Sequence, residues 1–290
     1  MTTDIKPFVK WVGGKRQLIQ QITKYLPEQY NKYYEPFLGA GAVFFRLLPN
    51  NACINDMNEE LINVYKIIRD DVESLIIDLK NHEKNNSKEY YYKIREWDRN
   101  SSYINRSPVE KAARFIYMNK VSFNGLYRVN KSGQYNVPYG RYINPKITDE
   151  DLLKRISLYL NKQTITITSV DFEVATTSVA EGDLVYFDPP YDPINMTSSF
   201  TEYQKGGFDR NEQIRLKKVA DKLVKKGAKV ILSNSNTKFI NDLYSNKIKD
   251  AQDTVNYFII EFLDARRNIN SKADRRGKIK EVLIVSKEVE

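Results

Sequence analysis

Cysteine and histidine are almost absent from the chain. One Cys and one His stand among 290 residues, so no internal disulfide can form and no zinc site of nitrogen and sulfur ligands can be completed. This scarcity predicts a metal-free protein of a reducing compartment. We expect Cys53 to lie in the core, because it falls within an apolar strand pattern, and His82 to be a solvated surface residue of a charged helical stretch.

Long apolar runs are lacking as well. No run approaches the roughly 18 apolar residues that a membrane helix needs. The first residues (MTTDIKPFVKW) have no apolar segment like that of a signal peptide. We therefore expect a cytoplasmic protein without a membrane partner.

Positive charge and tyrosine are plentiful by contrast. The 46 Lys and Arg residues against 37 Asp and Glu leave a net charge of +9, and there are 20 Tyr. Tyrosine can stack on a nucleobase or cap a core, so its number alone decides nothing. An excess of positive charge combined with many aromatics favours a polyanionic partner, most simply nucleic acid.

Short β-rich runs alternate with helical runs at both ends of the chain, which predicts an α/β fold. The strand candidates are residues 33–38, 52–56, 164–170, 183–187, 229–232 and 281–285, and the helix candidates are residues 16–26, 42–48, 90–97, 111–120 and 210–226. The middle of the chain is helical by period and ends in a predicted β-hairpin over residues 123–142, with a turn at Lys131-Ser132-Gly133. We expect this middle part to be an insertion that splits the sheet.

A glycine turn follows the first strand candidate. Phe37-Leu38-Gly39-Ala40-Gly41 leads from that strand into the apolar helix 42–48, as in the first half of a nucleotide-binding unit. Only two of the three dinucleotide-fingerprint glycines are present, which argues against a hydride-transfer site. Asp56 ends the next strand, where an acid suits ribose hydroxyls. Asp56 can equally be the N-cap of a helix ahead of Glu59 and Glu60.

The strongest motif is Asp188-Pro189-Pro190-Tyr191, directly after an apolar strand. The exocyclic amine of a nucleobase is a poor nucleophile, because its lone pair is delocalised into the ring. The Asp188 carboxylate and the Pro189 carbonyl can accept its two N–H groups, and the prolines stiffen the turn that holds them. Tyr191 offers a flat face for an extruded base. The alternative is a proline-rich turn with Asp as a turn former.

Asp171-Phe172 closes another strand candidate. The carboxylate can accept from the adenine amino group of a cofactor while the phenyl ring packs on the base. A strand-end turn acid beside a core Phe is the alternative, and the two residues alone favour this alternative.

Taken together, these residues resemble the DNA adenine methyltransferase (Dam) family, the α-class amino-methyltransferases that use S-adenosylmethionine. The resemblance covers nearly the whole chain in order. It includes Trp-x-Gly-Gly-Lys at residues 11–15, Phe-x-Gly-x-Gly at 37–41, Asn55-Asp56, the recognition hairpin at 123–142 and Asp-Pro-Pro-Tyr at 188–191. The overall look is closest to small Gram-positive restriction-system members that methylate GATC.

The resemblance implies a Rossmann-like methyltransferase sheet of residues 1–60 and 152–290, with an inserted helical and hairpin DNA-recognition domain of residues 61–151. It implies S-adenosylmethionine as cofactor, without a metal, and transfer of its methyl group to N6 of a flipped adenine in double-stranded DNA, most simply within GATC. We expect a protein of bacterial or phage origin that is a monomer in solution and that can bind DNA as more than one copy.

The resemblance also implies roles for individual residues. The catalytic residues would be Asp188, Pro189, Pro190 and Tyr191. The S-adenosylmethionine pocket would be lined by Trp11, Gly13, Gly14, Lys15, Phe37, Gly39, Gly41, Asp56, Asp171 and Phe172. DNA would be contacted by Lys10, Asn124, Leu126, Arg128, Pro138, Arg141 and Tyr142. Within this last set, Lys10 would contact the first guanine, while Leu126, Arg128 and Pro138 would read the outer base pairs.

Two segments depart from the family pattern, and one stretch is strongly basic. Phe123 stands where relatives often carry Tyr, and residues 192–199 (DPINMTSS) depart from the usual loop sequence, so the exact sequence preference stays open. Residues 264–280 hold seven basic residues against two acids. On a DNA-facing loop they would neutralise phosphates; otherwise they form a solvated basic loop.

Two other functions remain open from the sequence. The enzyme could methylate RNA adenine or a protein glutamine amide, although Asp188 stands where amide methylases of this superfamily usually carry Asn. The chain could also be a DNA-binding protein with a degenerate cofactor site, against which the intact Asp-Pro-Pro-Tyr and glycine motifs argue.

Overall fold

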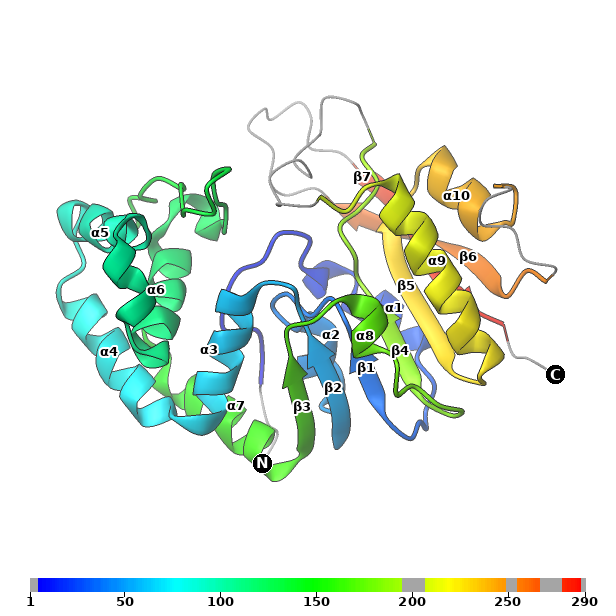
Figure 1. Cartoon of the computed structure of the whole chain (residues 1–290), viewed down its shortest axis with the longest axis horizontal. Coiled ribbons are helices and arrows are strands. Elements are labelled where there is room, and N and C mark those ends of the chain that lie inside the picture. Colours follow the sequence, from blue (N-terminus) through cyan, green and yellow to red (C-terminus); the bar gives the residue numbers. More distant parts are fainter. Residues whose placement is uncertain (1–4, 195–206, 249–254, 267–277, 288–290) are drawn as a thin grey trace. The chain divides into compact units, whose positions relative to one another are not determined.

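The computed structural model describes residues 5–194, 207–248, 255–266 and 278–287, and in this part of the chain seven strands form one sheet in the order β3-β2-β1-β4-β5-β7-β6 (Figure 1). The strands are β1 (Tyr33–Glu35), β2 (Asn51–Asn55), β3 (Thr164–Thr168), β4 (Leu184–Phe187), β5 (Lys229–Ser235), β6 (Phe258–Arg266) and β7 (Lys278–Ser286). β1 runs parallel to β2 and β4, and β4 runs parallel to β5, whereas β7 is antiparallel to both β5 and β6. The predicted α/β class is confirmed.

The chain folds into two compact units, each assembled from separate segments. The first contains residues 1–14, 38–50 and 55–170, and the second contains residues 15–37, 51–54 and 171–290. The predicted insertion, residues 61–151, falls within the first unit.

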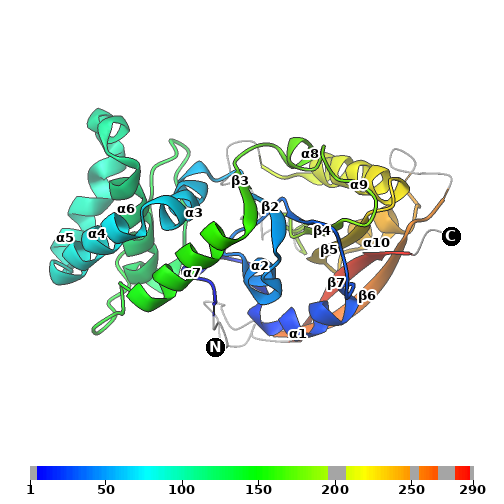
Figure 2. The same cartoon turned by 90° about the horizontal axis from the view of Figure 1, so that it is seen from below.

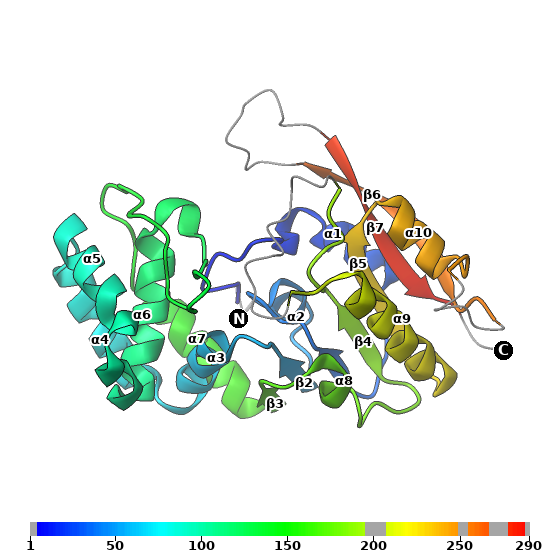
Figure 3. The same ribbon diagram turned by 45° about the horizontal axis from the view of Figure 1, so that its top comes forward.

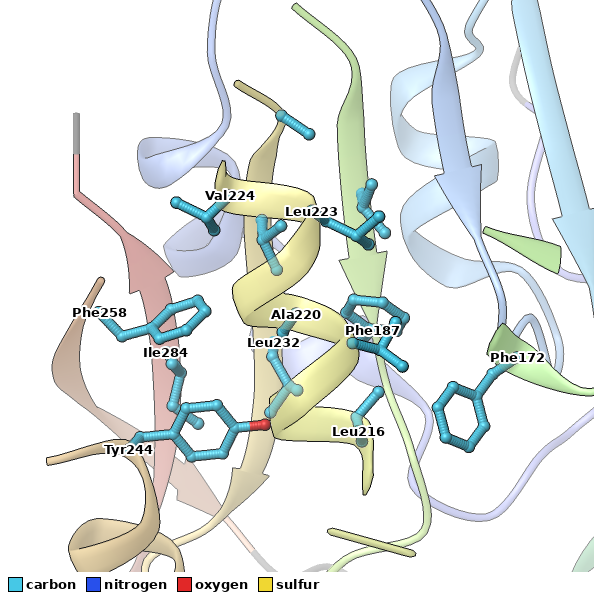
Figure 4. Packing of buried hydrophobic residues seen from close by; sticks show 14 of the residues in the cluster. Phe172, Phe187, Leu216, Ala220, Leu223, Val224, Leu232, Tyr244, Phe258 and Ile284 are labelled. Carbon is cyan, nitrogen blue, oxygen red and sulfur yellow. The ribbon is translucent and has the colours of Figure 1, made fainter. Parts of the chain in front are cut away.

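The second unit has its core between strands and one long helix. Asp209 is the N-cap of α9 (Arg210–Lys225), and its carboxylate accepts from two backbone N–H groups. The helix ends before Gly227, which has a φ of 85°. Figure 4 shows Leu216, Ala220 and Leu223 of α9 packed toward Leu232 of β5. The four residues of β4 are all buried, as expected for a parallel strand covered on both faces.

The remaining helices of this unit are short. α10 (Lys238–Tyr244) adds Ile240, Leu243 and Tyr244 to the same core as α9, and the two helices lie on one side of the strands (Figure 3). α1 (Ile19–Ile22) lies on the opposite side from α9 (Figure 2). The helix predicted over residues 16–26 is broken into η1 (Lys15–Gln17), α1 and η2 (Thr23–Tyr25). β6 was not predicted: its apolar residues are interrupted by Glu261 and Asp264, and as an edge strand it leaves Ile259 and Phe262 exposed.

The first unit is mainly helical. Its helices are α2 (Ala42–Leu47), α3 (Glu59–Asp70), α4 (Val72–Lys84), α5 (Lys88–Arg95), α6 (Pro108–Val121) and α7 (Glu150–Lys162). α6 carries a complete capping box, in which the Ser107 and Glu110 side chains each accept from the other's backbone N–H, and Pro108 occupies the first helical turn. α3 and α4 both pack on α6. Among the described residues no helix is long and apolar enough to cross a membrane.

The segment predicted as a β-hairpin, residues 123–142, is largely irregular. Its turn is confirmed, since Gly133 has a φ of 77° and Asn130 N–H donates to the Gln134 carbonyl. The strands are not, because this segment contributes only two isolated bridges, Val129 to Tyr135 and Ser122 to Tyr139. A second backbone bond, from Asn136 N–H to the Arg128 carbonyl at 3.0 Å, flanks the Val129 bridge. Side chains supplement these bonds: the Asp98 carboxylate accepts from Tyr135 N–H at 2.7 Å, and the Tyr135 hydroxyl donates to the Leu126 carbonyl at 2.6 Å.

His82 is buried, so its predicted surface position is wrong. The side chain is 4% exposed, stacks on Tyr117 at a centroid distance of 4.9 Å and lies 2.8 Å from the Tyr90 hydroxyl. Leu75, Leu79 and His82 share the buried face of α4. Their helical spacing indicates burial, whereas the charged neighbours of His82 favour a surface position. Burial lowers the pKa of His82 from its usual 6.5 to about 4, because it disfavours the charged ring. Cys53 is buried as predicted.

The buried imidazole makes stability depend on pH. The unfolded chain binds a proton at His82 below pH 6.5, and the folded chain binds one only near pH 4. His82 is therefore neutral in both states above pH 6.5 and costs stability progressively as the pH falls toward 4. Between pH 6.5 and 4, His82 should lower the free energy of unfolding of the parent by about 3 kcal/mol. His82→Phe should not show this decrease, as measured by urea unfolding. An identical pH dependence in both proteins would contradict the burial of a neutral ring.

Candidate active site

The strand order reverses between β1 and β4, which are parallel neighbours. β2 lies beyond β1, and β5 lies beyond β4. In open α/β sheets ligands bind beyond the carboxyl ends of the strands at such a reversal. The chain leaves β1 toward Phe37 and leaves β4 directly into Asp188. Two predicted motifs therefore begin at the reversal point.

Asp188 is paired with a buried lysine. The Lys15 ammonium lies 2.8 Å from Asp188 Oδ1, and the two side chains are 3% and 21% exposed. The same ammonium lies 4.7 Å from the centroid of the Tyr191 ring. The resemblance places Lys15 in the cofactor pocket, whereas the contacts in the structure join it to the Asp-Pro-Pro-Tyr motif.

Tyr191 is held at its hydroxyl end. The O–H donates to Glu281 Oε2 of β7 at 2.7 Å. Burial raises the pKa of Tyr191 well above its usual value, with the carboxylates of Asp188 and Glu281 adding to the rise, so the hydroxyl stays protonated and can donate. Glu281 was not predicted as a site residue. In the sequence, Glu281 stands out only as a single acidic residue at the start of an apolar strand run.

The proline turn is fixed by a buried amide network. Gln213 of α9 donates to the Pro190 carbonyl at 2.8 Å and accepts from Asn234 of β5 at 3.0 Å. The Asn234 side-chain oxygen accepts from Asp192 N–H, and Ser235 donates to the Asp192 carbonyl at 2.6 Å. Because Gln213 and Asn234 are fully buried, the backbone that carries the motif is anchored from both a helix and a strand.

Opposing effects act on the Asp188 carboxyl. Burial raises the pKa of Asp188 above its usual range, and the nearby Glu281 carboxylate adds to the rise. The Lys15 ammonium and the Tyr191 hydroxyl oppose it by favouring the charged form. The ionised group is an acceptor only, which is the property that a reaction at an amine needs.

Three phenylalanines form an aromatic cluster beside the motif at Asp171. The ring centroids of Phe37 and Phe172 are 5.5 Å apart, and Phe208 lies 5.5 Å from Phe37 and 5.9 Å from Phe172. The Arg215 guanidinium lies 4.0 Å from the Phe172 ring centroid. Phe172 is buried, whereas Phe37 and Phe208 are half-buried and can offer a face to a flat or cationic ligand.

Asp171 is the N-cap of α8 (Phe172–Ala175) and pairs with Arg215 through both carboxylate oxygens, at 2.9 and 2.7 Å. The hydrogen bonds from Arg215 hold the pKa of Asp171 below its usual range. Asp171 Oδ1 also accepts from Glu173 N–H at 2.9 Å, so the strand-end turn role is confirmed. Oδ1 therefore has two donors, and Oδ2 keeps a lone pair for a further donor.

The glycine turn of the first unit is tied to Asp56. Gly39 N–H donates to Asp56 Oδ2 at 2.8 Å, while Asp56 Oδ1 accepts from Asn58 N–H at 2.9 Å. Asn58, not Asp56, caps α3, so the alternative reading of Asp56 as the cap is wrong. Burial raises the pKa of Asp56, and the two N–H donors oppose the rise.

Gly39 must be glycine for two reasons. Its φ is +50°, and a Cβ there would lie 2.6 Å from Cδ1 of the Trp11 side chain. Trp11 in turn stacks on Tyr127 at 5.4 Å, and its carbonyl accepts from Gly14 N–H at 3.2 Å. Gly13 and Gly41 also have positive φ, of 80° and 69°. The residues form a tight backbone cradle of the kind that a ligand can approach closely.

The predicted DNA-contacting residues are accessible in the first unit. Lys10, Asn124, Pro138 and Arg141 are exposed, and Leu126, Arg128 and Tyr142 are half-buried. Asn119 fixes the Lys10 backbone by accepting from its N–H and donating to its carbonyl, and the Lys10 ammonium lies 5.3 Å from the Tyr142 ring centroid.

Arg128 Nε donates to Asn136 Oδ1 at 2.7 Å, so its guanidinium is oriented within the loop. Residues 267–277 of the basic stretch and residues 195–199 of the divergent loop lie outside the described residues. Within the described ranges, no group of three His, Cys, Asp or Glu side chains is arranged to hold a metal ion.

Comparisons with known proteins agree on one family. The model of the D12 class N6 adenine-specific DNA methyltransferases matches residues 11–257. The Type II methyltransferase M1.LlaDCHI of Lactococcus lactis subsp. cremoris is 47% identical over 283 residues, which cover 98% of this chain and 96% of the relative. The Type II methyltransferase M.MjaIII of Methanocaldococcus jannaschii is 44% identical, covering 98% and 99%. The DNA adenine methylase of Vibrio cholerae serotype O1 is 32% identical, covering 96% and 95%.

The amide network predicts a stability effect. Gln213→Leu would leave the Pro190 carbonyl without its donor and the Asn234 amide without its acceptor, both in a buried place. We expect the free energy of unfolding to fall by about 3 kcal/mol, measured by urea denaturation. Lys218→Leu changes an exposed residue of the same helix and should stay within about 0.5 kcal/mol of the parent. Equal effects of the two changes would show that the network does not anchor the turn.

Proposed function

The chain belongs to the D12 class of N6 adenine-specific DNA methyltransferases, and from this premise we propose that it transfers a methyl group from S-adenosylmethionine to N6 of an adenine in GATC. Members of this class act on double-stranded DNA. The observation that carries the proposal is the partly buried Asp188 carboxylate at the carboxyl end of β4, beside a proline turn anchored from α9.

The role proposed for the motif follows from the chemistry of the amine. Asp188 accepts one N–H of the adenine amino group and the Pro189 carbonyl accepts the other, which directs the nitrogen lone pair out of the ring plane. The acceptors are fixed before the base arrives, so little reorganisation is needed during the reaction. The nitrogen would receive the methyl group that bound S-adenosylmethionine supplies, and it would release one proton to water.

Tyr191 is proposed to stack on the extruded adenine. Glu281 fixes the ring through the hydroxyl, so the aromatic face is oriented in advance. Extruding a base from duplex DNA costs a few kcal/mol, and stacking on an aromatic side chain returns about 1–3 kcal/mol of it.

The residues assigned to the cofactor have groups that fit it. Bound S-adenosylmethionine would supply a methyl group attached to a sulfonium sulfur, whose leaving group is a neutral thioether. The Phe37, Phe172 and Phe208 cluster offers faces for an adenine ring, and aromatic faces attract a cation by roughly 0.5–2 kcal/mol. Asp56 is tied to Gly39 and keeps acceptor capacity for ribose hydroxyls. The full proposed set is Trp11, Gly13, Gly14, Phe37, Gly39, Gly41, Asp56, Asp171 and Phe172.

The GATC assignment rests on the loop residues that match the family. Arg128 can donate two hydrogen bonds to guanine in the major groove, and Leu126 and Pro138 can contact a thymine methyl group. Lys10 is proposed to contact the first guanine. Asn124, Arg141 and Tyr142 are proposed to support the DNA backbone and the disturbed base stack.

The proposed function is tested with radiolabelled S-adenosylmethionine and a set of duplexes: GATC, its single-base variants, and GATC already methylated at the adenine. We expect transfer to unmethylated GATC and to no variant duplex. Asp188→Ala should lower the rate by at least about 10²-fold, because it removes an acceptor used in the transition state, and it should leave cofactor binding intact by calorimetry. Glu181→Gln, at an exposed acid of the same unit, should leave the rate unchanged. Transfer to RNA or protein instead of duplex DNA, or undiminished turnover by Asp188→Ala, would refute the proposal.

Arg128 carries a separate prediction about sequence preference. Arg128→Ala should relax discrimination at one base pair by about 1–3 kcal/mol, measured as the ratio of kcat/KM for GATC and its variants. Lys131→Ala, at the exposed tip of the same loop, should preserve that ratio. If Arg128→Ala weakens every duplex equally, the residue contacts only phosphate.

A further inference from the structure

Lys15 occupies the surroundings that the proposed function gives to the adenine amine. Its ammonium lies 2.8 Å from Asp188 Oδ1, the proposed acceptor, and 4.7 Å from the centroid of Tyr191, the proposed stacking surface. The side chain is only 3% exposed. Lysine is almost never buried this fully unless it is paired, because removing an ammonium from water is costly.

The ammonium and the target amine make competing demands. Both donate N–H groups to a carboxylate, and both lie against the same aromatic ring. A base stacked on that ring, with its amine at Asp188, needs volume that the ammonium fills. A lysine has a flexible four-carbon stem with three rotatable donors, so the ammonium can swing away without a change of the backbone.

Several charged or titratable groups face Asp188 from the surrounding elements. Lys15 faces it from η1, Glu281 from β7, Tyr186 from β4, and Tyr191 from the turn itself. Glu281 and burial favour the neutral carboxyl, and Lys15 favours the charged form. A neutral carboxyl would present an O–H to the amine and could accept less well. The ion pair therefore preserves the form of Asp188 that the reaction requires.

We propose that Lys15 is a positioning residue that keeps Asp188 ionised and stands in the place of the adenine amine until the base displaces it. This inference rests on the proposed function, and it assigns to Lys15 a role in the adenine site instead of the cofactor pocket. The lysine acts in the free enzyme, before the base enters the site, and it does not contact the methyl group during transfer.

The test compares the parent with Lys15→Met, which keeps most of the length of the side chain without its charge, and with Lys15→Arg, which keeps the charge. Methyl transfer to a GATC duplex is measured from pH 4.5 to 9, and kcat/KM and kcat are analysed separately. The pH dependence of kcat/KM reports the free enzyme, and that of kcat reports the complex with substrate.

The expected result is a split between the two profiles. Without the ammonium, the pKa of Asp188 rises further, so activity is lost at a higher pH as the pH falls. The acid limb of kcat/KM in Lys15→Met should move up by about 1–3 pH units and stay in place in Lys15→Arg. The acid limb of kcat should match the parent, because the adenine has replaced the lysine in the complex.

A second measurement reports how readily a base leaves the stack in the presence and absence of the ammonium. A duplex with 2-aminopurine at the target adenine becomes more fluorescent when that base leaves the stack. At pH 8.5, Lys15→Met should give a larger fluorescence rise than the parent, because no ammonium has to leave the site. Thermal unfolding checks that each variant is folded, and Lys15→Gln replaces Lys15→Met if the latter is not.

The outcomes separate the two proposals. If the parent transfers no methyl group to duplex DNA, the proposed function fails. If the parent is active but the charge-removing variant keeps the parental acid limb in kcat/KM, the inference about Lys15 is wrong and the proposed function stands. A variant that loses S-adenosylmethionine binding by calorimetry would also overturn the inference, because it would return Lys15 to the cofactor pocket.

Discussion

The arrangement of the second unit depends on one constraint, which is a carboxylate held largely away from water at the end of a parallel strand. Asp188 leaves β4 where the strand order reverses, and an unpaired charge there would be costly. The Lys15 ammonium offsets that cost, and Glu281 holds the neighbouring Tyr191 in place. The proline turn and the Gln213 amide fix the backbone between them. Each of these contacts serves either to keep the carboxylate charged or to keep it in position.

The sheet supplies the rigidity on which this site depends. β4 is buried on both faces, and α9 covers it with a continuous apolar face, so the residue that follows the strand has little freedom. The same construction places Phe37 after β1 and Asp56 after β2, although these two parts belong to different units of the chain. The proposed chemistry is thus concentrated in the short segments after parallel strands. The helices and strands supply packing and the side chains that anchor these segments, such as Gln213 of α9 and Glu281 of β7.

The sequence predicted what local pattern can encode. The apolar run before Asp188, the positive-φ glycine at Gly39 and the helix α9 all have signatures within a few residues. Contacts between distant residues have no such signature: Glu281 and Tyr191 are 90 positions apart, and nothing near either residue indicates the other. The segment 123–142 keeps the predicted turn but not the predicted strands, because only a few of its backbone groups pair with one another and side chains such as Asp98 satisfy others. The pairing of Lys15 with Asp188 was missed for the same reason of distance along the chain.

The central claim is that Asp188 and the Pro189 carbonyl receive the two N–H groups of an adenine amine. A crystal structure with a GATC duplex and sinefungin, an unreactive analogue of S-adenosylmethionine, tests it most directly. The account predicts an extruded adenine on Tyr191, with N6 within hydrogen-bond distance of Asp188 and of the Pro189 carbonyl oxygen, and with the Lys15 ammonium withdrawn from Asp188. An adenine that stays in the helix, or an amine that faces other groups while Lys15 remains on Asp188, would contradict it.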